Sequence, residues 1–431
     1  MLKLLGTQPR LIIGNVVSDA VMDQPDDDYV QRMEAGMPRK VWTMREGDIL
    51  ITSVAVPAHM KQYACQTLGL NPDNIVCLTP AQRLSYFLTE NILADQTLMQ
   101  ELRQLIQSRP GIEYYPFLLD NYAMALAQEL HIPISLYGGL YAEDIQKKAI
   151  VENIIYQMNR KSHFRNTMVE LGAHVARGHV VTSPQTFIQV ATDHLKSSTK
   201  IIIKRDRGSN GYGHTVIDRN DPDVNSQIQH FASEMLSVPY IVEDFLAQRW
   251  APSIELAVAN DGPHLLYPCD QRCLNNSWVG MSIPPLDLPA SLHTAITNAA
   301  FSFGKYLYQA GYRGVFDVDG VANEVGNWIV TETNLRTTGG THMHIILTRL
   351  LGEDYLTHYW TLAESIRTNN TSFATLFEKM EQAQIAFRPE KQEGVIITAD
   401  GTLTDGKFRY ILFAHNVERA LQIEDILRNL L

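Results

Sequence analysis

The stretch "IVTETNLRTTGG", residues 329–340, sets polar side chains into an otherwise apolar strand. Side chains two positions apart share one face of a strand, so Glu332 and Asn334 point the same way, and Asp319 on the preceding strand can face them across a hairpin. Two carboxylates and a carboxamide oxygen suit Mg²⁺ that bridges nucleotide phosphates. Arg336 would reach the same cluster and stabilise charge on a phosphoryl group.

The alternative interpretation is a solvent-facing strand whose polar residues are unrelated to one another. These residues stand inside apolar runs, however, and a charged side chain that is buried there needs a partner. We therefore interpret the cluster as a metal and phosphate site.

A second constellation lies upstream, in "IIIKRDRGSNGYGHTVI", residues 201–217. A strand delivers Lys204, and the glycines after it allow a loop whose backbone N–H groups could fold over phosphate oxygens. The loop lacks the Gly-Lys-Ser/Thr ending of a P-loop, and its place between two strands does not fit a dinucleotide fingerprint. A glycine-rich β-hairpin with a surface lysine is the alternative. The loop residues concerned are Gly208, Ser209, Asn210, Gly211 and Gly213.

A third constellation is the strand "YIVEDFL", residues 240–246. Its acidic end, Glu243 and Asp244, could accept a hydrogen bond from the amino group of a purine. Phe245 and Leu246 could cover the faces of the base. An ordinary strand end is the alternative interpretation.

Composition bounds the kind of protein. A chain of 431 residues is long enough for two or three domains. Hydrophobic residues make up 45% of it and charged residues 19%, which excludes a disordered protein. No apolar run approaches the roughly 20 residues of a membrane helix. Four cysteines and the lack of a secretory signal favour the cytoplasm. A net charge of −11 argues against nonspecific nucleic-acid or membrane binding, although a local basic cleft is compatible with it.

The pattern of apolar residues predicts an open α/β layer in residues 1–150. "DQPDDDY", residues 23–29, is interpreted as a solvated loop, and a metal-binding loop is the less favoured alternative. Further on, we expect a hairpin that turns at Asp261-Gly262 and a helix within residues 288–312. Residues 393–431 are typical of a small strand–strand–helix unit.

The three constellations, in this order, resemble those of the ATP-grasp superfamily of carboxylate–amine ligases. The resemblance covers residues 150–345 through motifs and extends more loosely to both ends. It implies an α/β and α+β fold with ATP and Mg²⁺, or Mn²⁺, as cofactors. The implied parts are a Rossmann-like pre-ATP-grasp domain (1–150), an ATP-grasp core (151–365) with a lid subdomain (about 185–245), and a small C-terminal α+β unit (366–431).

The resemblance also implies a nucleotide site. Lys161 and Lys204 are similar to the two bases that contact ATP, and residues 208–213 are similar to the mobile phosphate lid. Residues 243–246 are similar to the adenine hinge, and Glu255 is similar to the acidic residue that meets the ribose.

At the reacting end, the residues similar to the metal ligands and the phosphate arginine are Asp319, Glu332, Asn334 and Arg336. One position departs from the D-alanine ligase branch, which has an arginine two residues before the metal-binding aspartate where this chain has Asp317. A carboxylate cannot stabilise an oxyanion, so either Arg313 takes that role or Asp317 recognises a cation on a substrate. A third metal ligand is the less favoured role for Asp317.

The implied reaction begins with transfer of the ATP γ-phosphoryl group to a carboxylate, because a free carboxylate is inert toward amines. An amine then attacks the acylphosphate and phosphate leaves. Since an acylphosphate hydrolyses readily, the lid must exclude water.

A narrower likeness is to the pheganomycin-type peptide ligase branch of natural product biosynthesis, and it implies a small-molecule acid and an amino acid or peptide acceptor. The likeness is carried by residues 47–70, 251–262 and 268–273 and by the C-terminal unit. Asp270 and Gln271 would then line the acceptor site, and a homodimer is possible. The rival functions are a ligase that charges a carrier protein or a non-peptide amine, and a non-catalytic ATP-binding module.

Two further pairs have less specific patterns. Cys269 and Cys273 resemble half of a zinc site, but no second pair follows at a suitable spacing. His342 and His344 could touch a substrate, although packing at the start of a helix is favoured.

Overall fold

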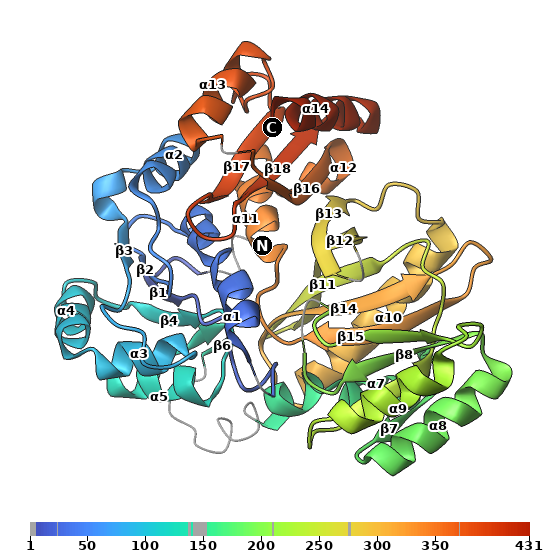
Figure 1. Cartoon of the computed structure of the whole chain (residues 1–431). Coiled ribbons are helices and arrows are strands. Elements are labelled where there is room, and N and C mark those ends of the chain that lie inside the picture. Colours follow the sequence, from blue (N-terminus) through green and yellow to red (C-terminus); the bar gives the residue numbers. More distant parts are fainter. Residues whose placement is uncertain are drawn as a thin grey trace.

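The computed structural model describes residues 6–23, 25–136, 139–140, 153–208, 211–274, 277–369 and 371–431. Figure 1 shows an N-terminal sheet (blue), a lid sheet (green) and a C-terminal part (red) beside a long central sheet. Within the described ranges, none of the helices combines the length and apolarity that crossing a membrane requires.

The N-terminal sheet is parallel, with the strand order β3-β2-β1-β4. Its two inner strands are short apolar runs that are fully buried, which is typical of a parallel sheet covered by helices. The strands are β1 (Arg10–Ile13), β2 (Ile49–Ile51), β3 (Val76–Leu78) and β4 (Glu113–Pro116), and a separate pair is β5 (Ser135–Leu136) and β6 (Gly139–Leu140). The helices are α1 (Asp27–Glu34), η2 (Met37–Thr43), α2 (Ala58–Leu68), η3 (Pro72–Asn74), α3 (Leu88–Ala94), α4 (Gln96–Gln107) and α5 (Asn121–Glu129).

Helix α1 corrects the prediction of a loop at residues 23–29. Asp26 is its N-cap and accepts from the backbone N–H of Tyr29, and Asp27 and Asp28 form its first turn. Carboxylates are favourable there because the free N–H groups and the helix dipole attract negative charge. The run of aspartates therefore begins a helix.

The lid sheet has four antiparallel strands in the order β7-β10-β8-β9. Two helices cover it, and their apolar side chains form a core that is separate from the cores of the rest of the protein. The elements are β7 (Gly178–Val181), α8 (Pro184–Ser197), β8 (Lys200–Arg205), β9 (Thr215–Asp218), α9 (Val224–Glu234) and β10 (Tyr240–Asp244).

The central sheet is antiparallel and has eight strands in the order β15-β14-β11-β12-β13-β16-β18-β17. Its strands are β11 (Pro252–Ala259), β12 (Gly262–Leu274), β13 (Ser277–Ile283), β14 (Gly314–Ala322), β15 (Trp328–Asn334), β16 (Trp360–Arg367), β17 (Gly394–Gly401) and β18 (Lys407–Ala414). The remaining helices are α7 (Lys161–Glu170), α10 (Ala290–Gln309), α11 (Thr341–Leu351), α12 (Tyr355–His358), α13 (Phe373–Gln382) and α14 (Val417–Leu430).

One expectation about the central sheet needs correction. The β11–β12 hairpin turns one residue earlier than predicted, because Ala259 pairs with Gly262 and leaves Asn260 and Asp261 in the turn. The C-terminal strands and helix form as expected. Strand β18 pairs with β16 along its whole length, so the C-terminal strands extend the central sheet.

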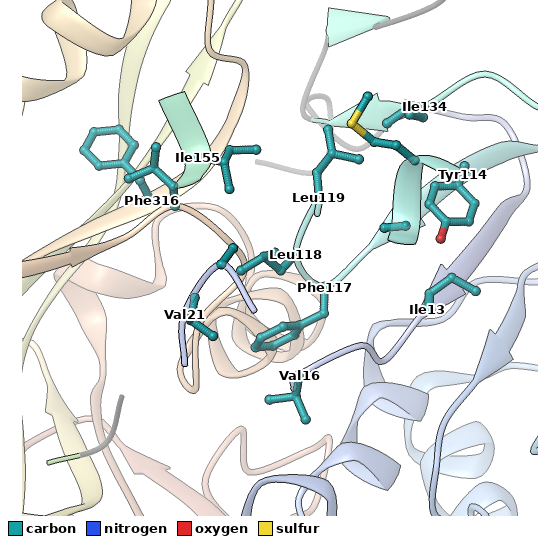
Figure 2. Close-up of a cluster of buried hydrophobic side chains, with 14 of the residues drawn as sticks. Ile13, Val16, Val21, Tyr114, Phe117, Leu118, Leu119, Ile134, Ile155 and Phe316 are labelled. Atoms are coloured by element: carbon teal, nitrogen blue, oxygen red, sulfur yellow. The ribbon is translucent and has the colours of Figure 1, made fainter. Parts of the chain in front are cut away.

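The N-terminal sheet and the central sheet share one hydrophobic core. Figure 2 shows the segment Phe117–Leu119 between side chains of the N-terminal sheet, such as Ile13, and Phe316 of the central sheet. Burial of each large apolar side chain contributes about 1.5–3 kcal/mol. A shared apolar core of this kind opposes relative motion of the two sheets, whereas the lid sheet is free of that restraint.

Candidate active site

A cavity of about 380 Å³ lies where the lid sheet, the central sheet, η2 and β18 meet. Its lining includes residues of the lid strands β8 and β10 and of the segment that follows β10. Strands β14 and β15, η2 and β18 also contribute lining residues. The cavity therefore brings together all three of the constellations identified in the sequence.

Strands β14 and β15 place four polar side chains in directly opposed pairs. Asp319 lies opposite Glu332, and Asp317 lies opposite Asn334. All four line the cavity. The strand alternation expected from the sequence thus gives one polar face. Gln271 also contacts this face, because its Nε2 donates a hydrogen bond of 3.0 Å to Oδ1 of Asp319.

Glu332 forms an ion pair with Lys161, with 2.6 Å between Oε2 and Nζ. Lys161 is the first residue of α7, and its ammonium also donates to the carbonyl of Gly208 in the glycine loop. Burial opposes ionisation of Glu332, but Lys161 and His214 outweigh it and lower the pKa of this carboxyl. Lys161 therefore connects the glycine loop to the carboxylate cluster.

The pKa values of the two aspartates of β14 shift in the opposite direction. Burial and the neighbouring Glu332 raise the pKa of Asp319 to about 7. Burial and Asp319 raise the pKa of Asp317 well above its usual range. Adjacent buried carboxylates repel each other in their charged forms, so this end of the cavity favours a cation.

Asn334 connects Asp317 to Arg336. Its backbone N–H and Nδ2 donate to Asp317 at 2.7 and 3.0 Å, and its Oδ1 accepts from Nη2 of Arg336 at 2.6 Å. The Arg336 guanidinium lies 5.5 Å from the centre of the Phe117 ring. Among the described residues, its buried Nε has no hydrogen-bond partner. The guanidinium is thus oriented with one donor left for a ligand.

Strand β10 carries the residues that resemble an adenine hinge, and its two carboxylates are paired in a way that the sequence did not predict. Both oxygens of Glu243 are engaged, by Lys204 at 2.8 Å and Arg165 at 2.7 Å. Asp244 is paired with Arg177 and His194. These carboxylates line the cavity with Phe245 and Leu246, but their charges are already compensated. Backbone groups are then the available acceptors for a purine amino group.

Lys204→Ala is expected to weaken ATP binding about tenfold or more, because hydrogen bonds to charged groups contribute about 1.5–3 kcal/mol. Arg165 would still compensate Glu243, so the lid sheet should keep its fold. The measurement is calorimetric titration of ATP together with thermal unfolding. Lys200→Ala is the matched control, since Lys200 lies on the same strand with a half-exposed side chain paired to Asp218. Equal ATP affinity in the wild type and Lys204→Ala would remove Lys204 from the site.

Three predicted site residues are not among the described residues that line the cavity. Glu255 is buried under Tyr267 and Thr338, whose hydroxyls both donate to it. Asp270 accepts from the backbone N–H of Ala251 and lies on the face of β12 opposite to Gln271. Arg313 precedes β14, lies 4.2 Å from the centre of the Tyr308 ring and donates to backbone carbonyls. The roles in ribose, acceptor and oxyanion binding inferred for these residues are therefore not supported.

In the glycine loop, Ser209 and Asn210 lie outside the described residues. Gly211 lines the cavity, and both Gly211 and Gly213 have positive φ angles, of 71° and 76°. Such backbone conformations favour glycine. The loop residue that sequence reasoning missed is His214, which lines the cavity and whose pKa falls to about 3 because of burial and the neighbouring Lys161 and Lys204. Its position directly after the glycine loop is the feature of the sequence that could have identified it as a site residue.

The lid loop contacts the N-terminal part of the protein. Arg207 pairs with Asp23 at 2.6 Å, and the ring of Tyr212 lies 5.3 Å from that of Tyr29 on α1. The hydroxyl of Tyr212 also donates to Asp26. These contacts tie Arg207 and Tyr212 to the N-terminal part of the protein.

The two less specific pairs have structural explanations. His342 and His344 are buried in α11, where Nδ1 of His344 bonds the hydroxyl of Tyr355. Cys269 and Cys273 lie at the cavity wall. Among the described residues, no group of three or more His, Cys, Asp or Glu side chains is arranged to hold a metal ion.

Comparison with known proteins agrees with this geometry. The family model described as the Pre ATP-grasp domain matches residues 37–132, and the model described as the PGM1 C-terminal domain matches residues 375–427. The butirosin acyl-carrier-protein–L-glutamate ligase of Niallia circulans is 26% identical over 191 residues, which are 43% of this chain and 45% of that protein. The match thus spans less than half of that relative.

Solved structures match along nearly the whole chain. An N5-carboxyaminoimidazole ribonucleotide synthetase in complex with ADP has a TM-score of 0.58 and 13% identity, and the match covers 98% of this chain and 97% of that one. Biotin carboxylase from Campylobacter jejuni, in a β-γ-ATP complex, has a TM-score of 0.60 and 13% identity, with 100% and 92% covered. At this level of identity the likeness shows the fold, and it confirms the predicted fold class.

The architecture is that of an ATP-grasp fold preceded by a pre-ATP-grasp domain. A similar curated protein is a ligase that acts on an acyl carrier protein and L-glutamate.

Proposed function

We propose that the protein is an ADP-forming ligase that joins an amino-acid-like acid to the amine of an amino acid or peptide through an acylphosphate. The observation that carries the proposal is the single buried face formed by Asp317, Asp319, Glu332 and Asn334, with Arg336 beside it and Lys161 and Lys204 at its nucleotide end. A non-catalytic ATP-binding module has no need to keep this face complete.

The donor set fits Mg²⁺. Asp319 and Glu332 lie opposite each other and Asn334 adds an amide oxygen, so the donors are all hard oxygens. The raised pKa of Asp319 also indicates a place where added positive charge is favourable. When bound, Mg²⁺ would neutralise charge on the β and γ phosphate oxygens.

The side chains of this chain would act on phosphate and on the acid. A carboxylate oxygen of the acid attacks the γ-phosphorus, the bond from γ-phosphorus to the β–γ bridging oxygen breaks, and ADP leaves. Lys161, Lys204 and Arg336 would spread the charge of the transferring group. The amine then attacks the acyl carbon, loses a proton and expels phosphate. The lid loop, whose flanking Arg207 and whose Tyr212 contact the N-terminal part, would exclude water meanwhile.

A second candidate, supported by the name of the relative, is transfer of an amino acid to an acyl carrier protein. One screen separates the candidates: amino acids are tested in pairs with amino acids, dipeptides and a holo acyl carrier protein, and each pair is scored by ADP release and product mass. A product that forms only with the carrier protein supports the second candidate. Absence of ADP-coupled product with every pair would contradict the proposed function.

Asp317→Asn is expected to lower kcat/KM for substrates that carry an ammonium or guanidinium about tenfold or more, and to leave neutral analogues nearly unaffected. The reason is that Asp317 borders the reacting end and is already repelled by Asp319. The measurement is the ratio of specificity constants for charged and neutral substrates. Asp261→Asn, in an exposed turn, is the control. An unchanged ratio with a shifted Mg²⁺ requirement would assign Asp317 to the metal.

A further inference from the structure

One part of the cavity wall is basic. Helix η2 contributes Arg39 to it, and strand β18 contributes Lys407 and Arg409. Asp405 is the carboxylate found in this part among the described lining residues. With Arg32 of α1, which also lines the cavity, four cations and one carboxylate leave this part of the wall with an excess of positive charge, although the whole chain carries a net charge of −11.

Arg39 has no acidic partner among the described residues. Its side chain is only 9% exposed, and its buried Nε makes no hydrogen bond. Burial and the charge of Arg409 lower the pKa of this guanidinium to about 9. A buried charge is costly unless it is paired, so the position requires a compensating anion.

The two guanidinium groups converge on one glycine. A Cβ at Gly36 would lie 3.5 Å from Nε of Arg409 and 3.6 Å from Cζ of Arg39. Asp405 holds Arg409 from the other side, with 2.5 Å between Oδ2 and Nη2. Arg409 is therefore oriented and compensated by the protein, whereas Arg39 is oriented toward the cavity without compensation.

The basic part is connected to the reacting end. Lys40, next to Arg39 on η2, has its Nζ 4.6 Å from the centre of the Phe117 ring, and Arg336 lies over the same ring at 5.5 Å. Phe117 lines the cavity between them. One small ligand in this cavity thus has the reacting groups at one side and the Arg39–Arg409 pair at the other.

We propose that Arg39 and Arg409 bind a non-reacting carboxylate of a substrate, so that the ligase selects an acid or an amine carrying a second, free carboxylate. This inference rests on the proposed function. A carboxylate has two oxygens that match the planar donor fork of a guanidinium, and it supplies the missing charge opposite Arg39. The carboxylate belongs either to the acceptor, as in a free amino acid or peptide, or to the acid, as in a dicarboxylic amino acid.

Arg39→Gln tests the subsite. Kinetic constants are measured with L-alanine against L-alaninamide as acceptors and with L-glutamate against L-glutamine as acids, each paired with the best partner from the screen. We expect Arg39→Gln to raise KM about 10- to 100-fold for the substrate that carries the free carboxylate. The KM for ATP should not change, and the amide form should be equally poor with wild type and variant. If the KM for L-alanine rises, the acceptor carries the bound carboxylate; if the KM for L-glutamate rises, the acid carries it.

Arg103→Gln is the matched control, because Arg103 pairs with Glu129 on the surface and both side chains are about half exposed. Thermal unfolding without substrate checks the fold: Arg39→Gln should have an equal or higher Tm, since it removes a buried, uncompensated charge. A lower Tm with unchanged KM values would assign Arg39 a structural role and overturn the proposal. The proposal would also be overturned if the wild type used L-alaninamide as well as L-alanine and L-glutamine as well as L-glutamate.

A binding measurement separates this proposal from the proposed function. L-Glutamate and L-alanyl-L-alanine are titrated calorimetrically into wild type and Arg39→Gln in the presence of ADP. Affinity that Arg39→Gln weakens supports the subsite even if the wild type forms no product. Equal binding, or no binding, to both proteins would overturn it.

Discussion

Arg336→Lys is expected to lower kcat for ADP release about 10²- to 10³-fold while leaving ATP affinity nearly unchanged. The guanidinium is fixed by Asn334 and packed over Phe117, and Arg336 lines the cavity. A lysine retains the charge but lacks the planar fork, so it cannot bond Asn334 and a transferring phosphoryl group in the same geometry. The nucleotide end is formed by other residues, which is why binding should persist.

The matched control is Arg313→Lys. Arg313 was the other arginine that the sequence offered for charge stabilisation, but its side chain packs on Tyr308 outside the cavity. We expect nearly wild-type kcat for this variant. The assignment would be reversed by the opposite pair of results, with Arg313→Lys inactive and Arg336→Lys active.

Glu332→Gln should likewise retain ATP and lose ADP formation by about 10²- to 10³-fold. The substitution keeps the shape of the side chain but removes the charge that faces Asp319 and pairs with Lys161. Both the proposed Mg²⁺ site and the orientation of Lys161 depend on that charge. ATP affinity is measured by titration and turnover by ADP release over a range of Mg²⁺ concentrations.

Glu324→Gln is the control for this variant, because Glu324 lies between β14 and β15 with a side chain that is 79% exposed. It should behave as wild type. Turnover of Glu332→Gln near the wild-type value at saturating Mg²⁺ would rule out Glu332 as a metal ligand.

The carboxylate face was predictable from the sequence because strand alternation is a local property. Glu332 and Asn334 lie two positions apart, and a short connection fixes the strand that carries Asp317 and Asp319 opposite them. Lys204 and the hinge were predictable for the same reason, since each belongs to a continuous strand that ends at the cavity.

Errors arose where tertiary packing covers a side chain or where the face of a strand is ambiguous. Glu255 lies directly opposite Asp317, on the expected face of β11, but the side chains of Tyr267 and Thr338 cover it. Asp270 and Gln271 are neighbours in sequence, so only one of them can face the cavity, and the sequence does not state which.

The basic part of the cavity wall could not be predicted at all. Arg39 and Arg409 come from opposite ends of the chain and meet because β18 extends the central sheet through β16. That pairing is long-range, and neither residue stands in a motif.

The central claim is that ATP activates a carboxylate by phosphorylating it. The direct test uses the productive pair from the screen with ¹⁸O in both oxygens of the reacting carboxylate, followed by mass spectrometry of the released phosphate and nucleotide. The account predicts ADP and phosphate that carries one ¹⁸O atom per amide formed, because the attacking carboxylate oxygen leaves with phosphorus. Unlabelled phosphate, or AMP with pyrophosphate as the nucleotide products, would contradict it.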